Sequence, residues 1–311
     1  MAGAGEHVTI VMATLNGAAY LPEQLQSLAA QSHADWSLFV SDDGSGDATR
    51  AILRDFGRRH RVHLVDGPGT VGQGGGAAAN FLSALCHADL PAGIVALADQ
   101  DDVWLPGKLA RGLRRMAAAP GTGPLLYAAE SALADRRLRP LRLTTAGRAE
   151  PGFAAALGQN LFGGHTTMLN PAALALVRAA GPVAGIAFHD WWIYQLLAGA
   201  GARLVLDPAA TALYRQHGGN VMGAARGPMQ GVARLGRVLD GRWKAEMQAQ
   251  AGALASVAHL LTPAARQTLE RFLAAPDRGM ARVRRFRQLG IRRSSARGNV
   301  LMLGAAFAGL L

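Results

Sequence analysis

Three carboxylates lie within four residues of this chain, at Asp99, Asp101 and Asp102. They follow an apolar run, residues 93–98, that is typical of a buried strand. Clustered like charges repel in a poorly solvated place unless a cation or another partner compensates them. Hard oxygen ligands at the tip of a strand suit Mg²⁺ or Mn²⁺ that holds a diphosphate. The cluster therefore indicates metal-assisted group transfer.

Polar side chains also follow the first and second predicted strands. Thr14 and Asn16 come after the first strand, and both could hydrogen-bond a base or a ribose. Asp42 and Asp43 come after the second, where one carboxylate can accept the N–H of a pyrimidine base. The alternative is that both segments are turns that cap the next helix. Two adjacent acids are nevertheless more than a turn requires.

The first hundred residues alternate between short apolar runs and helical patterns, which predicts a mainly parallel sheet. The predicted strands are 8–12, 36–40, 62–65 and 94–98, and the predicted helices are 21–31, 48–56 and 77–86. Successive β-α units of this kind predict a doubly wound α/β domain flanked by helices, whose ligands bind at the carboxyl ends of the strands. All three polar groups lie at those ends, so we expect them to form one site.

Beyond residue 120 the alternation loosens. We expect strands at 125–128, 166–169, 203–206 and 211–214, and helices at 171–180 and 191–197. The Arg-rich segment 136–148 is expected to be mobile. From about residue 232 the pattern becomes helical and basic. This predicts a catalytic domain over residues 1–225 and a helical, basic region over residues 226–311.

Composition indicates the cellular compartment of the protein. The single cysteine, Cys86, excludes an internal disulfide framework and fits a reducing compartment. The amino terminus shows no signal-peptide pattern, and no apolar run reaches 18 residues, so we expect a cytoplasmic protein without a transmembrane helix.

The net charge of +11 is concentrated at the carboxyl end. Residues 271–311 contain nine Arg and one Asp, and they finish in the uncharged run 300–311. Arginines beside an apolar end favour an anionic membrane surface over nucleic acid. We therefore expect no nucleic-acid partner, and peripheral contact with the inner face of the cell membrane. The alternative is a helix whose apolar face packs on the domain.

Taken in order, these motifs resemble those of family 2 glycosyltransferases with the GT-A fold. The similarity rests on residues 14–16, 42–45 and 99–104, and on the later stretches 189–192 and 214–220. The later stretches are most similar to bacterial rhamnosyltransferase-like members. The resemblance implies an inverting, metal-dependent transfer of a sugar from a dTDP- or UDP-sugar, with dTDP-L-rhamnose as a candidate donor. The acceptor would be a hydroxyl of a surface glycan or a lipid-linked glycan.

The resemblance also implies roles on the donor side. Asp101 would be a direct metal ligand, and Asp99 would lie nearer the ribose. Asp102 would add charge or a supporting bond. His217 would complete the metal or diphosphate site; its alternative is an exposed loop histidine.

Asp190 falls where the family keeps its catalytic base. The common family pattern has Glu before this Asp, whereas this chain has His189, a departure shared by rhamnosyltransferase-like members. The alternative is that Asp190 only caps a helix whose tryptophans are core. Gly164, His165 and Trp191 match the acceptor side, although His165 could equally be structural.

Two other classes of function remain open. A nucleotidyltransferase also uses a doubly wound sheet with paired Asp and Mg²⁺. That class usually has a Gly-rich loop with Arg and Lys after its first strand, which this chain lacks. A non-catalytic protein with a GT-A-like fold is the second alternative. The intact acidic motifs argue against such decay.

Overall fold

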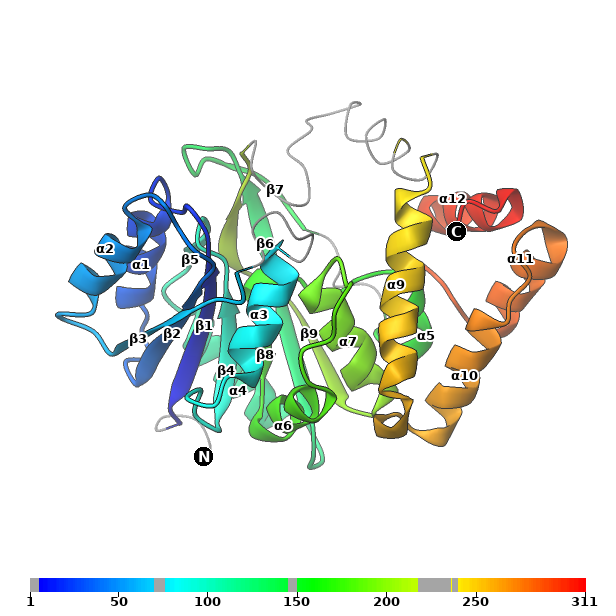
Figure 1. Ribbon diagram of the computed structural model, residues 1–311, viewed down its shortest axis with the longest axis horizontal. Helices are drawn as coiled ribbons and strands as arrows, with labels where there is room; N and C mark the ends of the chain where they lie inside the picture. Colours follow the sequence, from blue (N-terminus) through cyan, green and yellow to red (C-terminus); the bar gives the residue numbers. More distant parts are fainter. Residues whose placement is uncertain (1–5, 70–75, 145–149, 218–235, 237–239) are drawn as a thin grey trace.

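The structure is a computed structural model that describes residues 6–69, 76–144, 150–217, 236 and 240–311. A nine-stranded sheet flanked by helices forms the larger part, and further helices extend it at the carboxyl end (Figure 1). None of the helices within these ranges has the length and apolar character needed to cross a membrane.

The first half of the sheet is parallel and has the order β3-β2-β1-β4. Its elements are β1 (Val8–Thr14), α1 (Leu21–Ala29), β2 (Trp36–Asp42), α2 (Thr49–Phe56), β3 (Val62–Asp66), α3 (Gly76–Cys86) and β4 (Ile94–Ala98). In the register Thr14 lies opposite Asp42, and Met12 lies opposite Ala98, so these strands end at one edge. The predicted GT-A-type, doubly wound α/β fold is confirmed.

The second half of the sheet is mixed, with the order β4-β8-β6-β9-β5, and β7 pairs with β6. Its elements are β5 (Val103–Trp104), α4 (Lys108–Ala118), β6 (Leu125–Ala134), β7 (Pro140–Leu143), α5 (Phe153–Gly158), the 3-10 turn Gly164–Thr166, β8 (Met168–Leu169), α6 (Pro171–Ala180), α7 (His189–Gly199) and β9 (Arg203–Arg215). The two strands predicted at 203–206 and 211–214 are one strand, because shifts in the β6–β9 register let the pairing continue. Part of the Arg-rich segment forms β7 rather than a mobile loop, whereas residues 145–149 lie outside the described ranges.

Two hydrophobic cores lie on opposite faces of the sheet. Because neighbouring strand residues point to opposite faces, Ile10 and Met12 pack with α1, α2 and α4, while Val11 packs with α3, α6 and α7. The buried parallel strands are almost wholly apolar, as coverage on both faces requires; all five residues of β4 are buried.

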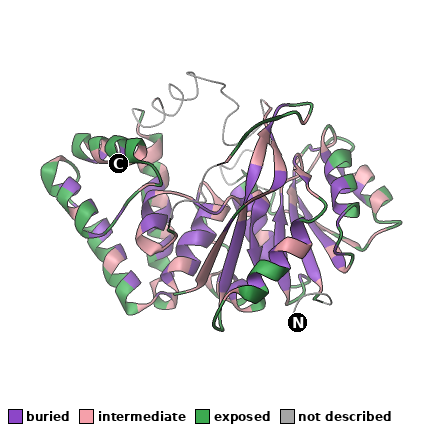
Figure 2. Cartoon of the chain, turned by 180° about the vertical axis from the view of Figure 1, so that it is seen from behind, coloured by how far each residue is buried: buried purple, intermediate pink, exposed green. Residues whose placement is uncertain are grey.

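The carboxyl-terminal helices pack into the core that contains Val11, α3, α6 and α7. They are α9 (Arg242–Ser256), the 3-10 turn Ala258–Leu260, α10 (Pro263–Leu273), α11 (Gly279–Gln288) and α12 (Ala296–Ala308). Met302, Ala306 and Leu311 are buried in the same cluster as the tryptophans of α7. The tail therefore packs on the sheet domain through one face, while its other face is exposed (Figure 2). The boundary predicted near residue 225 falls outside the described residues.

Candidate active site

The end of β2 is held by hydrogen bonds to its own loop. Asp42 is 1% exposed and accepts bonds from Thr14 Oγ1 (2.8 Å), the Ser45 amide (3.0 Å) and Ser45 Oγ (2.6 Å). Burial alone would raise the pKa of Asp42, but these bonds and Arg50 hold it below its usual value. The carboxylate is thus ionised, and both of its oxygens are engaged within the fold.

Asn16 ties the loop after β1 to the loop after β2, and Asp43 ties the loop after β2 to the loop after β3. The Asn16 backbone is left-handed (φ 48°), and its side-chain oxygen accepts the Gly46 amide at 2.9 Å. Asp43 is 2% exposed and accepts the Gly69 amide at 2.8 Å. Both residues thus lie at the predicted edge, where they shape the loops around it.

A side-chain amide joins the first loop to the acidic loop. Gln100 accepts the Leu15 amide and donates to the Leu15 carbonyl, each at 3.0 Å, which imitates a pair in a β-ladder. A Cβ on Gly17 would lie 2.2 Å from Gln100 Oε1, so only glycine leaves room for this pair. Sequence reasoning missed the role of Gln100.

Asp101 and His217 come together as predicted. His217 Nε2 lies 2.7 Å from Asp101 Oδ2, and the two side chains are 11% and 18% exposed, respectively. The His217 ring also packs against Tyr20, with 4.6 Å between the ring centroids. The Tyr20 ring thus helps to fix His217, and both side chains of the pair are partly exposed to solvent.

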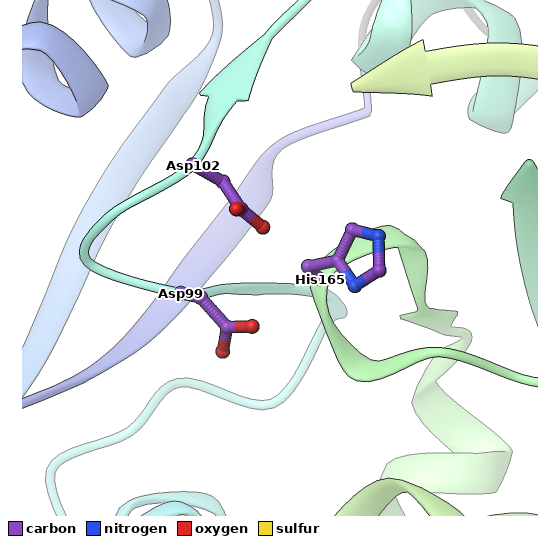
Figure 3. A group of neighbouring side chains, drawn as sticks. All are labelled: Asp99, Asp102 and His165. Carbon is purple, nitrogen blue, oxygen red and sulfur yellow. The ribbon is translucent and has the colours of Figure 1, made fainter. Parts of the chain in front are cut away.

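A deeper group comprises Asp99, Asp102 and His165, whose ligand atoms lie within 4.8 Å of one another (Figure 3). Burial raises the pKa of Asp99 to about 7, and repulsion from Asp101 and Asp190 adds to this effect. Burial and the neighbouring acids also raise the pKa of Asp102. The second oxygen of Asp102 has no hydrogen-bond partner among the described residues. Crowded acids with an orphaned oxygen fit a cation site.

Lys108 is a buried cation beside this group, and sequence reasoning missed it. Its Nζ donates to the His165 carbonyl and lies 3.9 Å from the Trp104 ring centroid. Burial lowers the pKa of Lys108 to about 7, against the opposite effect of Asp102 and Asp99. Lys108 thus compensates part of the deeper negative charge.

Arg215, at the end of β9, fixes the same loop and was also missed. It is 2% exposed and donates from Nε to the Asp101 carbonyl at 2.8 Å. Its amide donates to Asp102 Oδ1 at 3.0 Å, and another guanidinium nitrogen donates to Glu23. Arg215 thus holds the acidic loop at the Asp101 carbonyl through its side chain and at the Asp102 carboxylate through its backbone amide.

Asp190 enters the site from the first turn of α7. Its carboxylate accepts the Gly164 amide at 2.9 Å and the Trp191 amide at 2.7 Å. Phe188, not Asp190, occupies the cap position of this helix, so the helix-cap alternative does not describe its position. The charge of Asp190 contributes to the raised pKa of Asp99, which puts the two carboxylates in one electrostatic environment.

Gly164 lets the acceptor-side turn approach α7. A Cβ there would lie 2.8 Å from His189 Nε2 and 3.3 Å from Asp190 Cβ. His189 cannot easily retreat, because its ring stacks on Phe81 with 4.0 Å between the centroids. The close contact of Gly164 with Asp190 is therefore possible only because glycine has no side chain.

The other two residues predicted on the acceptor side are His165, which lies beside the acidic group, and Trp191, which lies in the core. His165 Nε2 lies 2.9 Å from Ser131 Oγ, and its ring stacks on Tyr214. Burial lowers the pKa of His165 to about 3, and Lys108 adds to this effect, so the ring is neutral beside the acids. Trp191 is 2% exposed and stacks on Trp243 of α9, so it belongs to the core.

Comparison with known proteins identifies the family. The glycosyl transferase family 2 model matches residues 9–172. The chain belongs to glycosyl transferase family 2. This glycosyltransferase is 27% identical to the dTDP-rhamnosyl transferase RfbG of Shigella flexneri over 256 residues, which cover 78% of this chain and 84% of that protein. The rhamnosyltransferase-like resemblance is confirmed.

Solved structures share the fold of this glycosyltransferase. Staphylococcus aureus TarS, in complex with UDP-GlcNAc, superposes with a TM-score of 0.57 at 14% identity, over 91% of this chain and 90% of that chain. The mannosyltransferase PcManGT from Pyrobaculum calidifontis, in complex with GDP-Man and Mn²⁺, has a TM-score of 0.53 at 19% identity, over 100% of this chain and 89% of that one.

Proposed function

We propose that this family 2 glycosyltransferase is an inverting, metal-dependent enzyme that uses a nucleotide-sugar donor. It moves the sugar to a hydroxyl of a glycan or lipid-linked acceptor in surface polysaccharide synthesis. The candidate donor is dTDP-L-rhamnose, a choice supported by the similarity to RfbG. The observation that carries the proposal is the Asp190 carboxylate, which is held by two backbone amides in the electrostatic environment of the acidic loop.

On the donor side, Asp101 and His217 would hold Mg²⁺ or Mn²⁺. When bound, the cation would neutralise charge on the departing nucleoside diphosphate. The Asp101 carboxylate and the His217 ring, which lie 2.7 Å apart and are partly exposed, support this assignment. Asp99 would lie by the ribose, with Asp102 as support. The carboxylate oxygen of Asp101 is the kind of ligand that hard divalent cations prefer.

The nucleoside would lie against the ends of β1 and β2. Thr14 and Asp42 are hydrogen-bonded to each other, and Asn16 holds the Gly46 amide, so these side chains fix the loops at this edge of the sheet. Asp43 would approach the base or ribose from the same edge. Preorganised loops of this kind reduce the cost of ordering a ligand.

On the acceptor side, Asp190 would take the proton of the attacking hydroxyl. The new bond forms between the acceptor oxygen and the anomeric carbon while the bond to the diphosphate breaks, which inverts the configuration. The Gly164 and Trp191 amides orient the carboxylate for this role. The neutral His165 lies at the same turn, and the Trp191 ring supports α7 from the core.

Two substitutions separate the proposed roles. Asp190→Asn should retain Mn²⁺-dependent donor binding but lose transfer by about a thousandfold, since a general base contributes on the order of 10²–10⁴. Asp101→Asn should lose the Mn²⁺-dependent binding itself. Asp55→Asn, an exposed acid on α2, is the matched control. Full transfer activity in Asp190→Asn would contradict the base assignment.

We also propose that the enzyme is cytoplasmic and peripheral on an anionic membrane, where its acceptor is presented. The division into a catalytic domain, 1–225, and a basic helical region, 226–311, remains part of this proposal. Support comes from the charge of residues 271–311, with nine Arg against one Asp.

A further inference from the structure

The β6–β7 hairpin combines exposed leucines with arginines. Leu141 and Leu143 are 54% and 53% exposed, and they project from the same face of β7 because they are two residues apart. Arg137 and Arg142 are exposed beside them, and Arg139 is exposed but forms an ion pair with Asp135 at 2.7 Å. No acid occurs between residues 136 and 144 of the sequence. The hairpin tip is therefore both basic and apolar, which a purely solvated loop does not require.

The outer face of α12 has the same character. Val300 is 72%, Leu301 69% and Phe307 54% exposed, at helical spacings that place them on one side. Met302 and Ala306 are buried on the opposite side. Arg297, in the first turn of α12, is exposed.

The neighbouring α11 adds positive charge to this region. Arg284 and Arg287 are exposed, whereas Arg282 turns inward and lies over the Phe286 ring. Aliphatic and aromatic side chains flanked by arginines are the composition of helices that lie in a membrane interface.

Both elements lie at the same end of the molecule. In Figure 1, β1 runs upward from the N-terminus, so the carboxyl ends of the parallel strands, the β7 hairpin and α12 are all toward the top of the view. The hairpin also contacts the site directly. Arg215 donates to the Arg136 carbonyl at 2.7 Å, and Arg136 donates to the hydroxyl of Tyr20, whose ring packs on His217.

We propose that the β6–β7 hairpin and the outer face of α12 form one surface that binds an anionic lipid bilayer. Docked in this way, the carboxyl edge of the sheet, with Asp101 and Asp190, is held close to the bilayer. The inference rests on the proposed function in that it names the surface by which the enzyme would be peripheral on a bilayer that carries the lipid-linked acceptor. Lipid binding itself needs no sugar donor.

Charge complementarity selects this partner. Each arginine near an anionic leaflet adds about 1 kcal/mol, or about fivefold in affinity. Nucleic acid would use the arginines but leave the exposed leucines and Phe307 unpaired with anything apolar. A second copy of the chain would cover the apolar residues but bring arginine against arginine, which opposes association.

The test is cosedimentation of the full chain with vesicles of phosphatidylglycerol and phosphatidylcholine, and with phosphatidylcholine alone. We expect binding only to the anionic vesicles, weakened by salt. Arg137→Gln/Arg142→Gln should weaken it by about 25-fold. Arg54→Gln/Arg59→Gln, which removes the same charge from exposed positions on α2 and in the turn after it, should leave it unchanged.

The apolar part of the surface is tested separately. Leu141→Ser/Leu143→Ser and Leu301→Ser/Phe307→Ser should each weaken vesicle binding by on the order of tenfold. Equal binding to both vesicle types, or no effect of either pair, overturns the proposal. So does a dimer in sedimentation equilibrium that these substitutions dissociate, because the surface would then face a second copy.

Donor binding, measured on the same protein by thermal shift with dTDP and Mn²⁺, separates the two proposals. Nucleotide binding without vesicle binding leaves the transferase function intact and removes the membrane surface. Vesicle binding without nucleotide binding supports the membrane surface and contradicts the proposed transferase function.

Discussion

The backbone of Gly164 offers a sharp test of the acceptor side. In Gly164→Ala the new Cβ would lie 2.8 Å from His189 Nε2, so about 0.6 Å must open to reach an ordinary contact of 3.4 Å. His189 is backed by Phe81, so we expect α7 to shift and to carry Asp190 with it. Since a misplacement of about 1 Å can cost about 10²-fold, we expect a shift of about 0.6 Å to lower kcat by about 15-fold. Overpacking should also cost about 1–3 kcal/mol of stability.

The assay is the initial rate of sugar transfer at saturating donor, with KM measured for the donor. KM should change little, because the clash does not touch Asp101 or His217. Gly107→Ala, where an added Cβ meets nothing within 4 Å, is the control. His189→Ala should relieve the clash and restore part of kcat in the double variant. A normal kcat in folded Gly164→Ala would refute the reasoning.

Two further predictions concern buried charges. Burial alone would raise the pKa of Asp207, but hydrogen bonds from Arg111 at 2.6 and 2.8 Å help to hold it below its usual value. This stabilisation is present above about pH 4 and is lost as pH falls through the lowered pKa. Asp207→Asn should therefore lower the free energy of unfolding in urea by about 2 kcal/mol at neutral pH, with the difference from wild type vanishing in acid. Burial lowers the pKa of Lys108 to about 7, whereas an unfolded lysine has a pKa of about 10.4. Proton uptake by Lys108 therefore disfavours the folded state as the pH falls from about 10 to about 7, and Lys108→Met, which has no proton to take up, should become more stable relative to wild type over that range. The measurement is urea unfolding at about pH 9.5 and about pH 6; an equal difference from wild type at both pH values would contradict the lowered pKa.

The sequence predicts the first half of the fold well, because parallel strands buried on both faces are continuous apolar runs. The ends of those strands carry the polar residues, so their meeting at one edge follows from topology alone. Beyond residue 120 the strands are short or shifted in register. Long-range pairing, as between β6 and β9, sets their limits, and local pattern does not show it.

The site is predictable where an acid follows a strand and less so where a side chain turns inward. Lys108 falls on the buried face of α4 with Leu109, Gly112 and Leu113, and that periodicity is the one signal that could have revealed it. Trp191 matched an acceptor-side motif, yet its neighbours in space include Trp243, about fifty residues away in sequence. The packing of α9 against α7 places the Trp191 ring in the core, and the local sequence does not show this.

A panel of nucleotide sugars, assayed for donor turnover and thermal shift with Mn²⁺ and with EDTA, tests the central claim most directly. We predict that dTDP-L-rhamnose with Mn²⁺ gives the largest shift and supports transfer, and that EDTA abolishes both. Asp101→Asn should behave like the wild-type protein in EDTA. Turnover that is unchanged by EDTA, or a response to nucleoside triphosphates instead of nucleotide sugars, would contradict the account.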